Sequence, residues 1–227
     1  MENNIKTVVL ARGTSLSKIN RLNDIDINQA IIINRFYAEL SNRNIFNFLL
    51  NKDVVHMLAI QNNPPCQLPK KMYRKLNIKY CIVNRTKKQC DIGGKLTDYM
   101  DDHPAKLALE NYDINMDIRY LPEDIDDIAI CEADGKGLQS TGLLAIAYAT
   151  HYLNSNDVYI IGLDFHDVPY YAPQYSTMKS WDPRKPKVIN RMKIGFEEWV
   201  RKTPNVKYHI LTDSQFRFNA PNIEWIE

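Results

Sequence analysis

The stretch Asp157-Val-Tyr-Ile-Ile-Gly-Leu163 is continuous, apolar and rich in β-branched residues. A strand of this composition is typical of a parallel sheet, in which helices bury both faces of the strand. The stretch follows Ser140–Tyr152, a run that is apolar nearly all round and has the length of a helix. Such a helix should pack directly against the sheet. A helix followed by a buried strand is the repeating unit of an α/β fold.

The same alternation recurs on both sides of this stretch. Short β-rich runs that end at polar or turn residues predict further strands. These runs are Ile5–Ala11, Gln29–Asn34, Asp53–Ile60, Tyr80–Asn84 and Lys207–Leu211, with Met116–Tyr120 as an edge strand. Helices are predicted near Leu16–Leu22, with Ser15 as N-cap, and near Val188–Lys202. The sequence therefore predicts an α/β protein with a Rossmann-like, mostly parallel sheet flanked by helices, as a single domain over residues 1–227.

Residues 167–187 differ in character from the rest of the chain. They combine tyrosines, prolines, Trp181 and basic residues, with neither a helical nor a strand period. A loop of about 20 residues is uncommon in a compact domain and often serves as a lid or binding loop. We therefore interpret 167–187 as a lid or acceptor loop within the domain.

Composition narrows the function classes. Hydrophobic residues make up 44% of the 227 residues and charged residues 25%, which suits a chain with a buried core. The 29 Lys and Arg residues nearly balance the 27 Asp and Glu residues, giving a formal charge of +2. A broad nucleic-acid surface needs a clear basic excess, so no nucleic-acid partner is expected.

Targeting and metal signals are weak in this sequence. The start MENNIKTVVLARG lacks the pattern of a signal peptide, and no apolar run approaches the roughly 20 residues that a transmembrane helix needs. The four cysteines form no CxxC pair and the histidines are not spaced as zinc ligands, so reduced thiols in a cytoplasm and no metal are expected. The patch Lys70–Lys75 leaves peripheral membrane contact open, and homo-oligomerisation also stays open.

Polar residues follow several predicted strands. Ligands of open parallel sheets bind outside the carboxyl ends of the strands, where these residues should gather. The candidates are Arg12, Gly13 and Ser15 after the first strand, Asn34 after the second, Asn63 after the third, and Asp164, Phe165 and His166 after Asp157–Leu163. Ser140, Thr141 and Gly142 join them at a helix start, where free N–H groups favour an anion.

Each of these candidates also has an ordinary structural interpretation. Gly13 and Ser15 could form a plain strand-to-helix turn, and Ser140 could be only an N-cap, with Gly142 allowing close helix–sheet packing. Neither GxGxxG nor GxxxxGK[ST] is present. His166 near Asp164 suits ribose binding with general acid–base chemistry, but it could also be a solvated loop histidine. His56, within a strand pattern, is interpreted as structural.

Taken together, the motifs resemble those of the bacterial sialyltransferases of glycosyltransferase family 42, and more loosely the motility-associated glycosyltransferases. The resemblance covers most of the chain in matching order. The matching segments are Val8–Leu16, Asn34-Arg-Phe-Tyr37, Asn63-Pro64, Ser140-Thr-Gly142, Ile161-Gly-Leu-Asp-Phe165 and Tyr171-Ala172.

The resemblance implies a GT-A-like variant domain that transfers a sugar from a CMP-activated donor, such as CMP-sialic acid, to a glycan acceptor. It implies inversion at the anomeric carbon and no metal requirement. The nucleotide site would be lined by Gly13, Ser15, Asn34, Asn63, Ser140, Thr141, Gly142, Asp164 and Phe165. Asp164 would face the ribose, and Tyr171 would reach the leaving phosphate.

The chain also departs from this family's pattern. The family's second phosphate-binding tyrosine is His166 here, and Arg12 stands where the family has an asparagine. No histidine lies between His166 and His209, so the family's lid histidine has no counterpart. His166, or a carboxylate such as Asp167 or Asp182, is the hypothesised base. The alternatives are a non-catalytic nucleotide-binding protein and an α/β hydrolase, which the absence of GxSxG disfavours.

Overall fold

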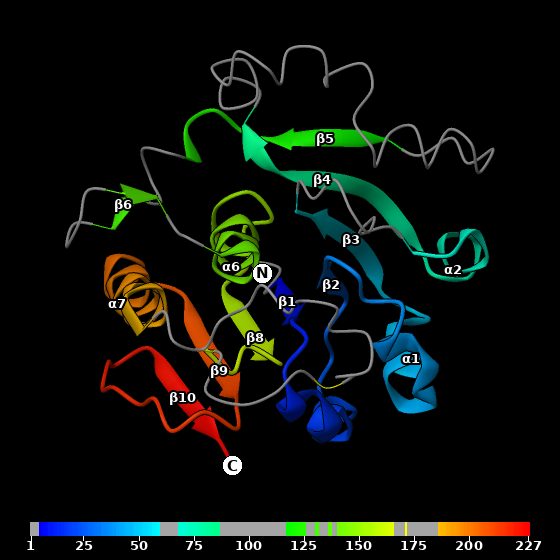
Figure 1. Cartoon of the computed structure of the whole chain (residues 1–227). Coiled ribbons are helices and arrows are strands. Elements are labelled where there is room, and N and C mark those ends of the chain that lie inside the picture. The colour runs from blue at the N-terminus through cyan, green and yellow to red at the C-terminus, as the bar shows by residue number, and fades with distance from the viewer. Residues whose placement is uncertain are drawn as a thin grey trace.

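The structure, a computed structural model, describes residues 5–59, 68–86, 117–125, 130–131, 136–137, 140–165, 171 and 186–227. Its centre is an eight-stranded sheet of strand order β10-β9-β8-β1-β2-β3-β4-β5 (Figure 1). All seven strand pairs of this sheet are parallel. The strands are β1 Lys6–Leu10, β2 Gln29–Ile33, β3 Asp53–Leu58, β4 Ile78–Thr86, β5 Ile118–Leu121, β8 Asp157–Ile161, β9 Lys207–Leu211 and β10 Ile223–Ile226.

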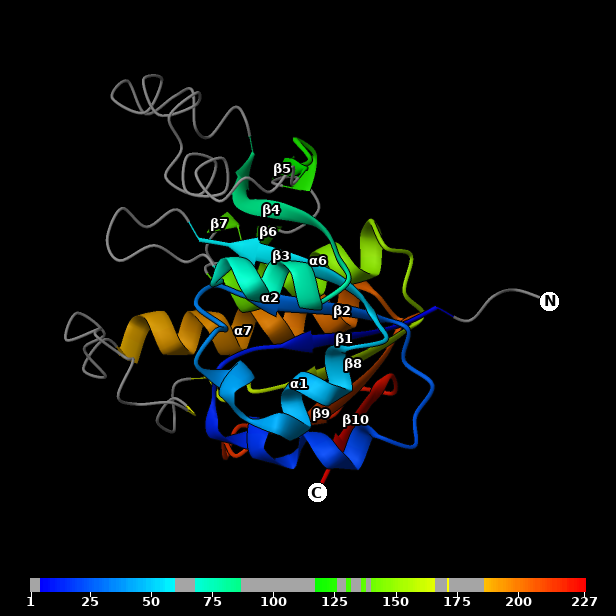
Figure 2. The same ribbon diagram turned by 90° about the vertical axis from the view of Figure 1, so that its right-hand side faces the viewer.

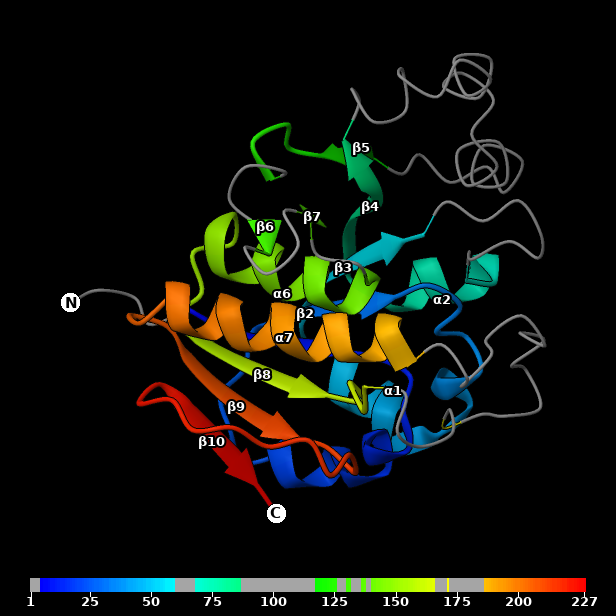
Figure 3. The same cartoon turned by 60° about the vertical axis from the view of Figure 1, so that its left-hand side comes forward.

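Helices cover both faces of the sheet. One face carries α6 Thr141–His151 and α7 Pro186–Lys202 (Figure 3). The other face carries the 3-10 helices η1 Thr14–Leu22 and η2 Glu39–Ser41, with α1 Arg43–Leu49 and α2 Lys70–Lys75 (Figure 2). A separate antiparallel pair joins β6 Ile130–Cys131 to β7 Lys136–Gly137.

The strand order reverses at β1. From β1 the chain builds β2, β3, β4 and β5 on one side, and β8, β9 and β10 then extend the sheet on the other side. The junction of β1 and β8, with Lys6 opposite Asp157 and Leu10 opposite Ile161, is therefore the topological switch point. Ligands of open α/β sheets bind beyond the carboxyl ends of the strands at this place.

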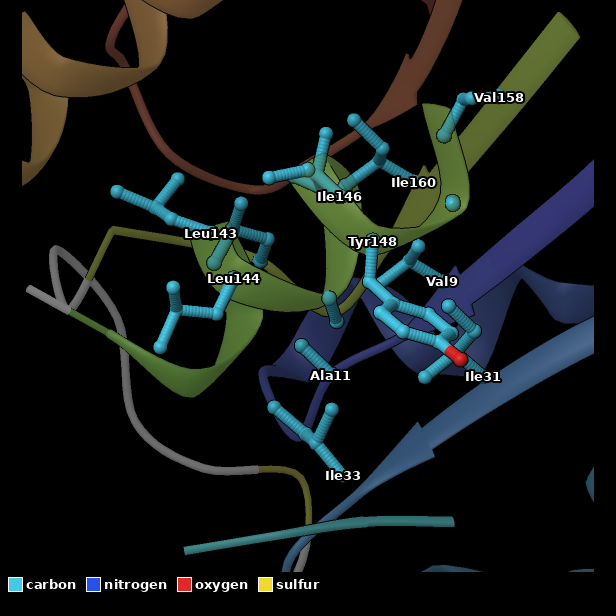
Figure 4. Packing of buried hydrophobic residues seen from close by; sticks show 14 of the residues in the cluster. Val9, Ala11, Ile31, Ile33, Leu143, Leu144, Ile146, Tyr148, Val158 and Ile160 are labelled. Atoms are coloured by element: carbon cyan, nitrogen blue, oxygen red, sulfur yellow. The ribbon is translucent and has the colours of Figure 1, made fainter. Parts of the chain in front are cut away.

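The helix α6 lies over this junction and is buried along almost its whole length. Its side chains from Leu143 to Tyr148 pack on Val9 and Ile31 of the central strands and on Val158 of β8 (Figure 4). A helix that is apolar all round suits this place, because the sheet covers one side of it and α7 and flanking segments cover the rest. The amino end of α6 is thereby fixed near the carboxyl ends of the strands.

The predicted α/β class, the parallel sheet and the flanking helices are confirmed. The sheet is wholly parallel where the sequence predicted mostly parallel. The predicted short helix near Leu16–Leu22 is confirmed as a 3-10 helix over Thr14–Leu22, but the predicted N-cap, Ser15, is wrong, because Gly13 is the N-cap. The strand β10 and the helix α1 were not predicted.

Some predictions fall on segments outside the described residues. Of the predicted lid, 167–187, the structure describes Tyr171 and the first two residues of α7, so the lid stays a prediction. Within the described part of the chain, no helix has both the length and the apolarity needed to cross a membrane.

Candidate functional site

The amino end of α6 lies at the carboxyl edge of the central strands. Ser140 is its N-cap, and the Ser140 Oγ accepts the Leu143 N–H at 3.1 Å. The first backbone bond of the helix runs from Leu144 N to Ser140 O at 3.0 Å. The N–H groups of Thr141 and Gly142 precede this bond and have no partner within the helix. Among the described residues they have no hydrogen-bond acceptor, and the positive end of the helix dipole lies behind them, an arrangement that favours an anion.

Gly142 brings this helix end close to two strands. A Cβ at Gly142 would lie 3.0 Å from the Leu163 Cδ1 and 3.9 Å from the Ile33 Cδ1. Leu163 follows β8 and Ile33 ends β2, so the free amides of α6 lie beside the ends of both strands. The predicted close packing at Gly142 is thus observed. Its assignment to nucleotide binding stays a prediction.

A residue that the site prediction missed, Asn84, anchors the same helix end. Asn84 lies near the end of β4, and its Nδ2 donates to the Thr141 Oγ1 at 2.9 Å. Both side chains are buried. The signal in the sequence was a polar residue at the end of the apolar run from Tyr80, but nothing there specified the partner.

Asn34 follows β2 and is partly exposed, with a left-handed backbone (φ 54°). Its side-chain Oδ1 accepts the Ala59 N–H at 2.8 Å, just beyond the end of β3. Because a backbone N–H needs an acceptor, this bond fixes which end of the amide faces Ala59. The Nδ2 group of Asn34, a donor, has no hydrogen bond to any other described residue.

The carboxylate of Asp164 ties together the segments that follow β1, β8 and β9. Its Oδ1 accepts from the Ser15 Oγ at 2.6 Å, from the Thr212 Oγ1 at 2.9 Å and from the Asp213 N–H at 3.0 Å. Its Oδ2 accepts from the Ser15 N–H at 3.0 Å. Ser15 is fully buried and Asp164 is only 4% exposed. Four donors therefore already satisfy the carboxylate that the resemblance assigned to the ribose.

Gly13 packs directly against this carboxylate. A Cβ at Gly13 would lie 2.1 Å from the Asp164 Oδ2 and 2.7 Å from the Gly162 O. The Gly13 N–H donates to the same Gly162 O at 2.7 Å. The absence of a side chain at Gly13 is thus required by the protein itself, whether or not a ligand approaches there.

Arg12 turns its side chain toward η2. Its Nε donates to the Oε1 of Glu39 at 2.7 Å, with Arg12 9% exposed and Glu39 fully buried. Burial raises the pKa of Glu39 above its ordinary value, although the Arg12 charge and hydrogen bond oppose the shift. The Glu39 Oε2 is buried without a hydrogen-bond partner among the described residues. Arg12 and Glu39 together form a buried ion pair that holds the first turn against η2.

Tyr171 also docks on this first turn. Its backbone N–H donates to the Arg12 O at 2.8 Å, and its hydroxyl accepts a hydrogen bond from the Asn42 Nδ2. Phe165 lies between Phe196 and Phe216 in the core, with a left-handed backbone (φ 49°). The structure thus turns the Tyr171 hydroxyl to Asn42 and buries the Phe165 ring.

The structure brings the described candidates to one edge of the sheet in two groups. In the first group, Gly142 at the amino end of α6 lies beside Ile33, which Asn34 follows, and Ser140 and Thr141 belong to the same helix end. In the second group, Arg12, Gly13, Ser15 and Asp164 form buried turns after β1 and β8. His166 and Asn63 lie outside the described residues, so their roles stay predictions. In the segments that the structure describes, no group of three or more His, Cys, Asp or Glu residues could hold a metal ion.

The fold and this edge define an α/β protein with an eight-stranded parallel sheet and a candidate ligand site at its switch point. Among solved structures, it is similar to the sialyltransferase CST-II, crystallised in complex with a trisaccharide acceptor and CMP. The TM-score is 0.54 at 16% sequence identity, over 96% of this chain and 86% of the other. No family model and no curated protein matches the chain. The likeness to CST-II shows a shared fold.

Proposed function

We propose that this protein is a sialyltransferase-like glycosyltransferase that binds a CMP-activated sugar at the carboxyl edge of β1, β2 and β8. The observation that carries the proposal is the capped amino end of α6, which lies at the switch point of the sheet. The fold likeness to a sialyltransferase crystallised with CMP supports the same nucleotide. The same likeness supports a glycan acceptor, because that structure also holds a trisaccharide acceptor.

In this proposal, the free N–H groups of Thr141 and Gly142 receive the phosphate of the donor. An acceptor hydroxyl attacks the anomeric carbon, the bond from that carbon to the phosphate oxygen breaks, and the hydroxyl proton passes to a base. The amides at the helix end then stabilise the charge that grows on the departing CMP. His166 is the proposed base, with Asp167 and Asp182 as alternatives. No metal is needed in this scheme, so transfer should persist in a chelator.

A second candidate is a nucleotide-binding protein that transfers no sugar. One observation favours it: the two groups that the resemblance assigns to the ribose and the phosphate are engaged elsewhere. The Asp164 carboxylate is saturated by Ser15, Thr212 and Asp213, and the Tyr171 hydroxyl bonds Asn42. Both candidates use the same nucleotide site, and they differ in turnover.

The experiment is calorimetric titration of CMP and of cytidine, which lacks the phosphate, into three forms of the protein. Ser140→Asp keeps a good N-cap but places a negative charge at the amino end of α6. Its affinity for CMP should fall by about tenfold or more through repulsion of the phosphate, with little change for cytidine. Ser140→Thr, the matched control, should bind both ligands nearly as the wild type does.

Equal losses for CMP and cytidine would place the phosphate away from α6. Absence of CMP binding by the wild type would remove both candidates. A protein that binds CMP is then incubated with CMP-sialic acid, with and without a glycan acceptor. Release of CMP selects the transferase, and binding without release selects the second candidate.

A further inference from the structure

The histidine in the middle of β3, His56, lies outside the site described above but is linked to it by a buried chain of hydrogen bonds. Its ring is fully buried. The Nε2 lies 2.7 Å from the backbone O of Asn34, and the Nδ1 lies 3.0 Å from the hydroxyl of Tyr73. Buried polar groups are hydrogen-bonded as a rule, and both ring nitrogens of His56 have a partner.

The proton positions in this chain follow from its chemistry. A carbonyl oxygen only accepts, so the Nε2 carries the proton that bonds the Asn34 O. Burial lowers the pKa of His56 to about 4, so the ring is neutral near pH 7 and its Nδ1 has a free lone pair. The Tyr73 hydroxyl must then donate to the Nδ1. The Tyr73 oxygen in turn accepts the Leu68 N–H at 3.2 Å.

The chain ends at a residue with unusual backbone geometry. Asn34 has a φ of 54°, in the left-handed region, which few side-chain-bearing residues adopt and which asparagine tolerates better than most. Three groups of Asn34 form hydrogen bonds with β3 or with Ala59, the residue after it. The Asn34 N–H donates to the Met57 O at 2.8 Å, and its carbonyl accepts from His56. Its Oδ1 accepts the Ala59 N–H at 2.8 Å. Its carbonyl also accepts the Phe36 N–H at 2.8 Å. The side chain is partly exposed, and its Nδ2, a donor at the sheet edge, has no hydrogen-bond partner among the residues that the structure describes.

We propose that His56 is a positioning residue for the nucleotide site, which with Tyr73 holds Asn34 left-handed so that the Asn34 Nδ2 donates to the bound nucleotide. This inference rests on the proposed function for its ligand. The conformation of Asn34 is a property of the free protein and is measured separately. Without the His56 Nε2–H, the Asn34 carbonyl accepts only from the Phe36 N–H. The left-handed conformation of Asn34 then loses one of the hydrogen bonds that stabilise it.

The test compares four variants with the wild type. His56→Leu keeps the approximate volume but donates no hydrogen bond. His56→Gln can donate to the Asn34 O and accept from Tyr73, so it is the conservative rescue. Tyr73→Phe removes the hydroxyl that donates to His56 and keeps the shape of the ring. It tests the same hydrogen-bond chain if His56→Leu fails to fold. Val54→Ala shortens a buried side chain earlier in the same strand and controls for loss of stability alone.

Two readouts are taken on folded protein, well below each melting temperature. The first is the side-chain NH₂ signal of Asn34 in ¹⁵N-asparagine-labelled protein without ligand, assigned by its loss in Asn34→Asp. The second is the Kd for CMP by calorimetry. His56→Leu should shift the Asn34 signal and weaken CMP binding about tenfold, the effect of one hydrogen bond. Tyr73→Phe should act in the same direction, more weakly. His56→Gln and Val54→Ala should preserve both readouts.

An Asn34 signal that neither His56→Leu nor Tyr73→Phe moves would overturn the positioning role, whatever the affinity for CMP. Equal weakening by Val54→Ala and His56→Leu would also overturn it, because loss of stability would then explain the effect. Wild-type protein that binds no CMP would instead overturn the proposed function. In that case the ligand-free Asn34 signal still decides whether His56 sets the conformation of Asn34.

Discussion

At the scale of single residues, Gly13 is constrained by its contact with Asp164. Its φ of −77° is open to any residue, so the constraint is one of space. A Cβ would overlap the Asp164 Oδ2 and the Gly162 O, and the latter belongs to the backbone and cannot rotate away. Gly13→Ala should therefore lower the free energy of unfolding by about 3 kcal/mol or more, measured by urea denaturation.

Gly142→Ala is the matched control for this prediction. Its Cβ would meet the far end of the Leu163 side chain, which can move, and alanine is favoured over glycine in a helix by about 1 kcal/mol. The two effects should nearly cancel, so that stability changes by less than about 1 kcal/mol. A Gly13→Ala protein as stable as Gly142→Ala would contradict the contact with Asp164.

His56 should also make the protein sensitive to acid. Its pKa is lowered to about 4 by burial, from an ordinary value of 6.5. Between these values the unfolded chain binds a proton that the folded protein does not, so stability falls as the pH is lowered through this window. Titration of His56 should lower the free energy of unfolding by about 2 kcal/mol between pH 7.5 and pH 5.

The measurement is urea unfolding of the wild type and His56→Gln at pH 7.5 and pH 5. Glutamine does not titrate, so the stability difference between the two proteins should move by about 2 kcal/mol toward the variant at pH 5. Parallel losses of stability in the two proteins would show that other groups cause the acid sensitivity.

At the scale of elements, substitutions of Ser140, the N-cap of α6, should lower the free energy of unfolding by graded amounts. Ser140→Ala removes the acceptor for the Leu143 N–H and should cost about 1 kcal/mol of unfolding free energy. Ser140→Gly should cost only a few tenths of a kcal/mol. Ser140→Asp should be as stable as the wild type, which separates its effect on CMP from any effect on folding. Thermal and urea unfolding measure the order of stability among these variants. A Ser140→Ala protein as stable as Ser140→Asp would contradict the role of Ser140 as N-cap.

Elements with a strong apolar signal were predicted from the sequence, and short or polar elements were not. The strands β1, β2 and β9 and the helix α6 lie within one or two residues of their predicted bounds. β1, β2 and α6 are almost continuously buried, and β9 alternates between more exposed and buried positions as a strand does. The strand β10 was missed because Ile223–Ile226 is only four residues long, is at least partly exposed at every position, and contains the charged Glu224. The helix α1 was missed because polar residues interrupt its apolar positions.

The candidate site was predictable in place and not in its contacts. The carboxyl ends of parallel strands meet at one edge, so Asn34, Ser140 and Asp164 could be assigned to it from sequence alone. The partners of Asp164 could not, because Thr212 lies 48 residues further along and only the strand register brings it near. For the same reason Asn84 was overlooked, although it is bonded to a predicted residue.

At the scale of the whole molecule, stability should fall from the centre of the sheet to its edges. The strands β1 and β8 are paired on both sides and their side chains are buried. At the edges, β5 and β10 are paired on one side and are partly exposed. Amide hydrogens of β1 and β8 should exchange only by global unfolding, and those of β10 at least about tenfold faster. Native-state hydrogen exchange followed by NMR tests this, and uniform protection across the sheet would contradict it.

The pairing of β1 with β8 has a consequence for the growing chain on the ribosome. Lys6 meets Asp157, which is made about 150 residues later, or roughly 8–30 s at about 5–20 residues per second. During this interval the edge of β1 that pairs with β8 has no partner strand. Its unpaired N–H and C=O groups can then pair wrongly with another nascent chain. We therefore expect a chain that ends before Asp157 to keep this edge of β1 unpaired and to aggregate more readily than the full chain.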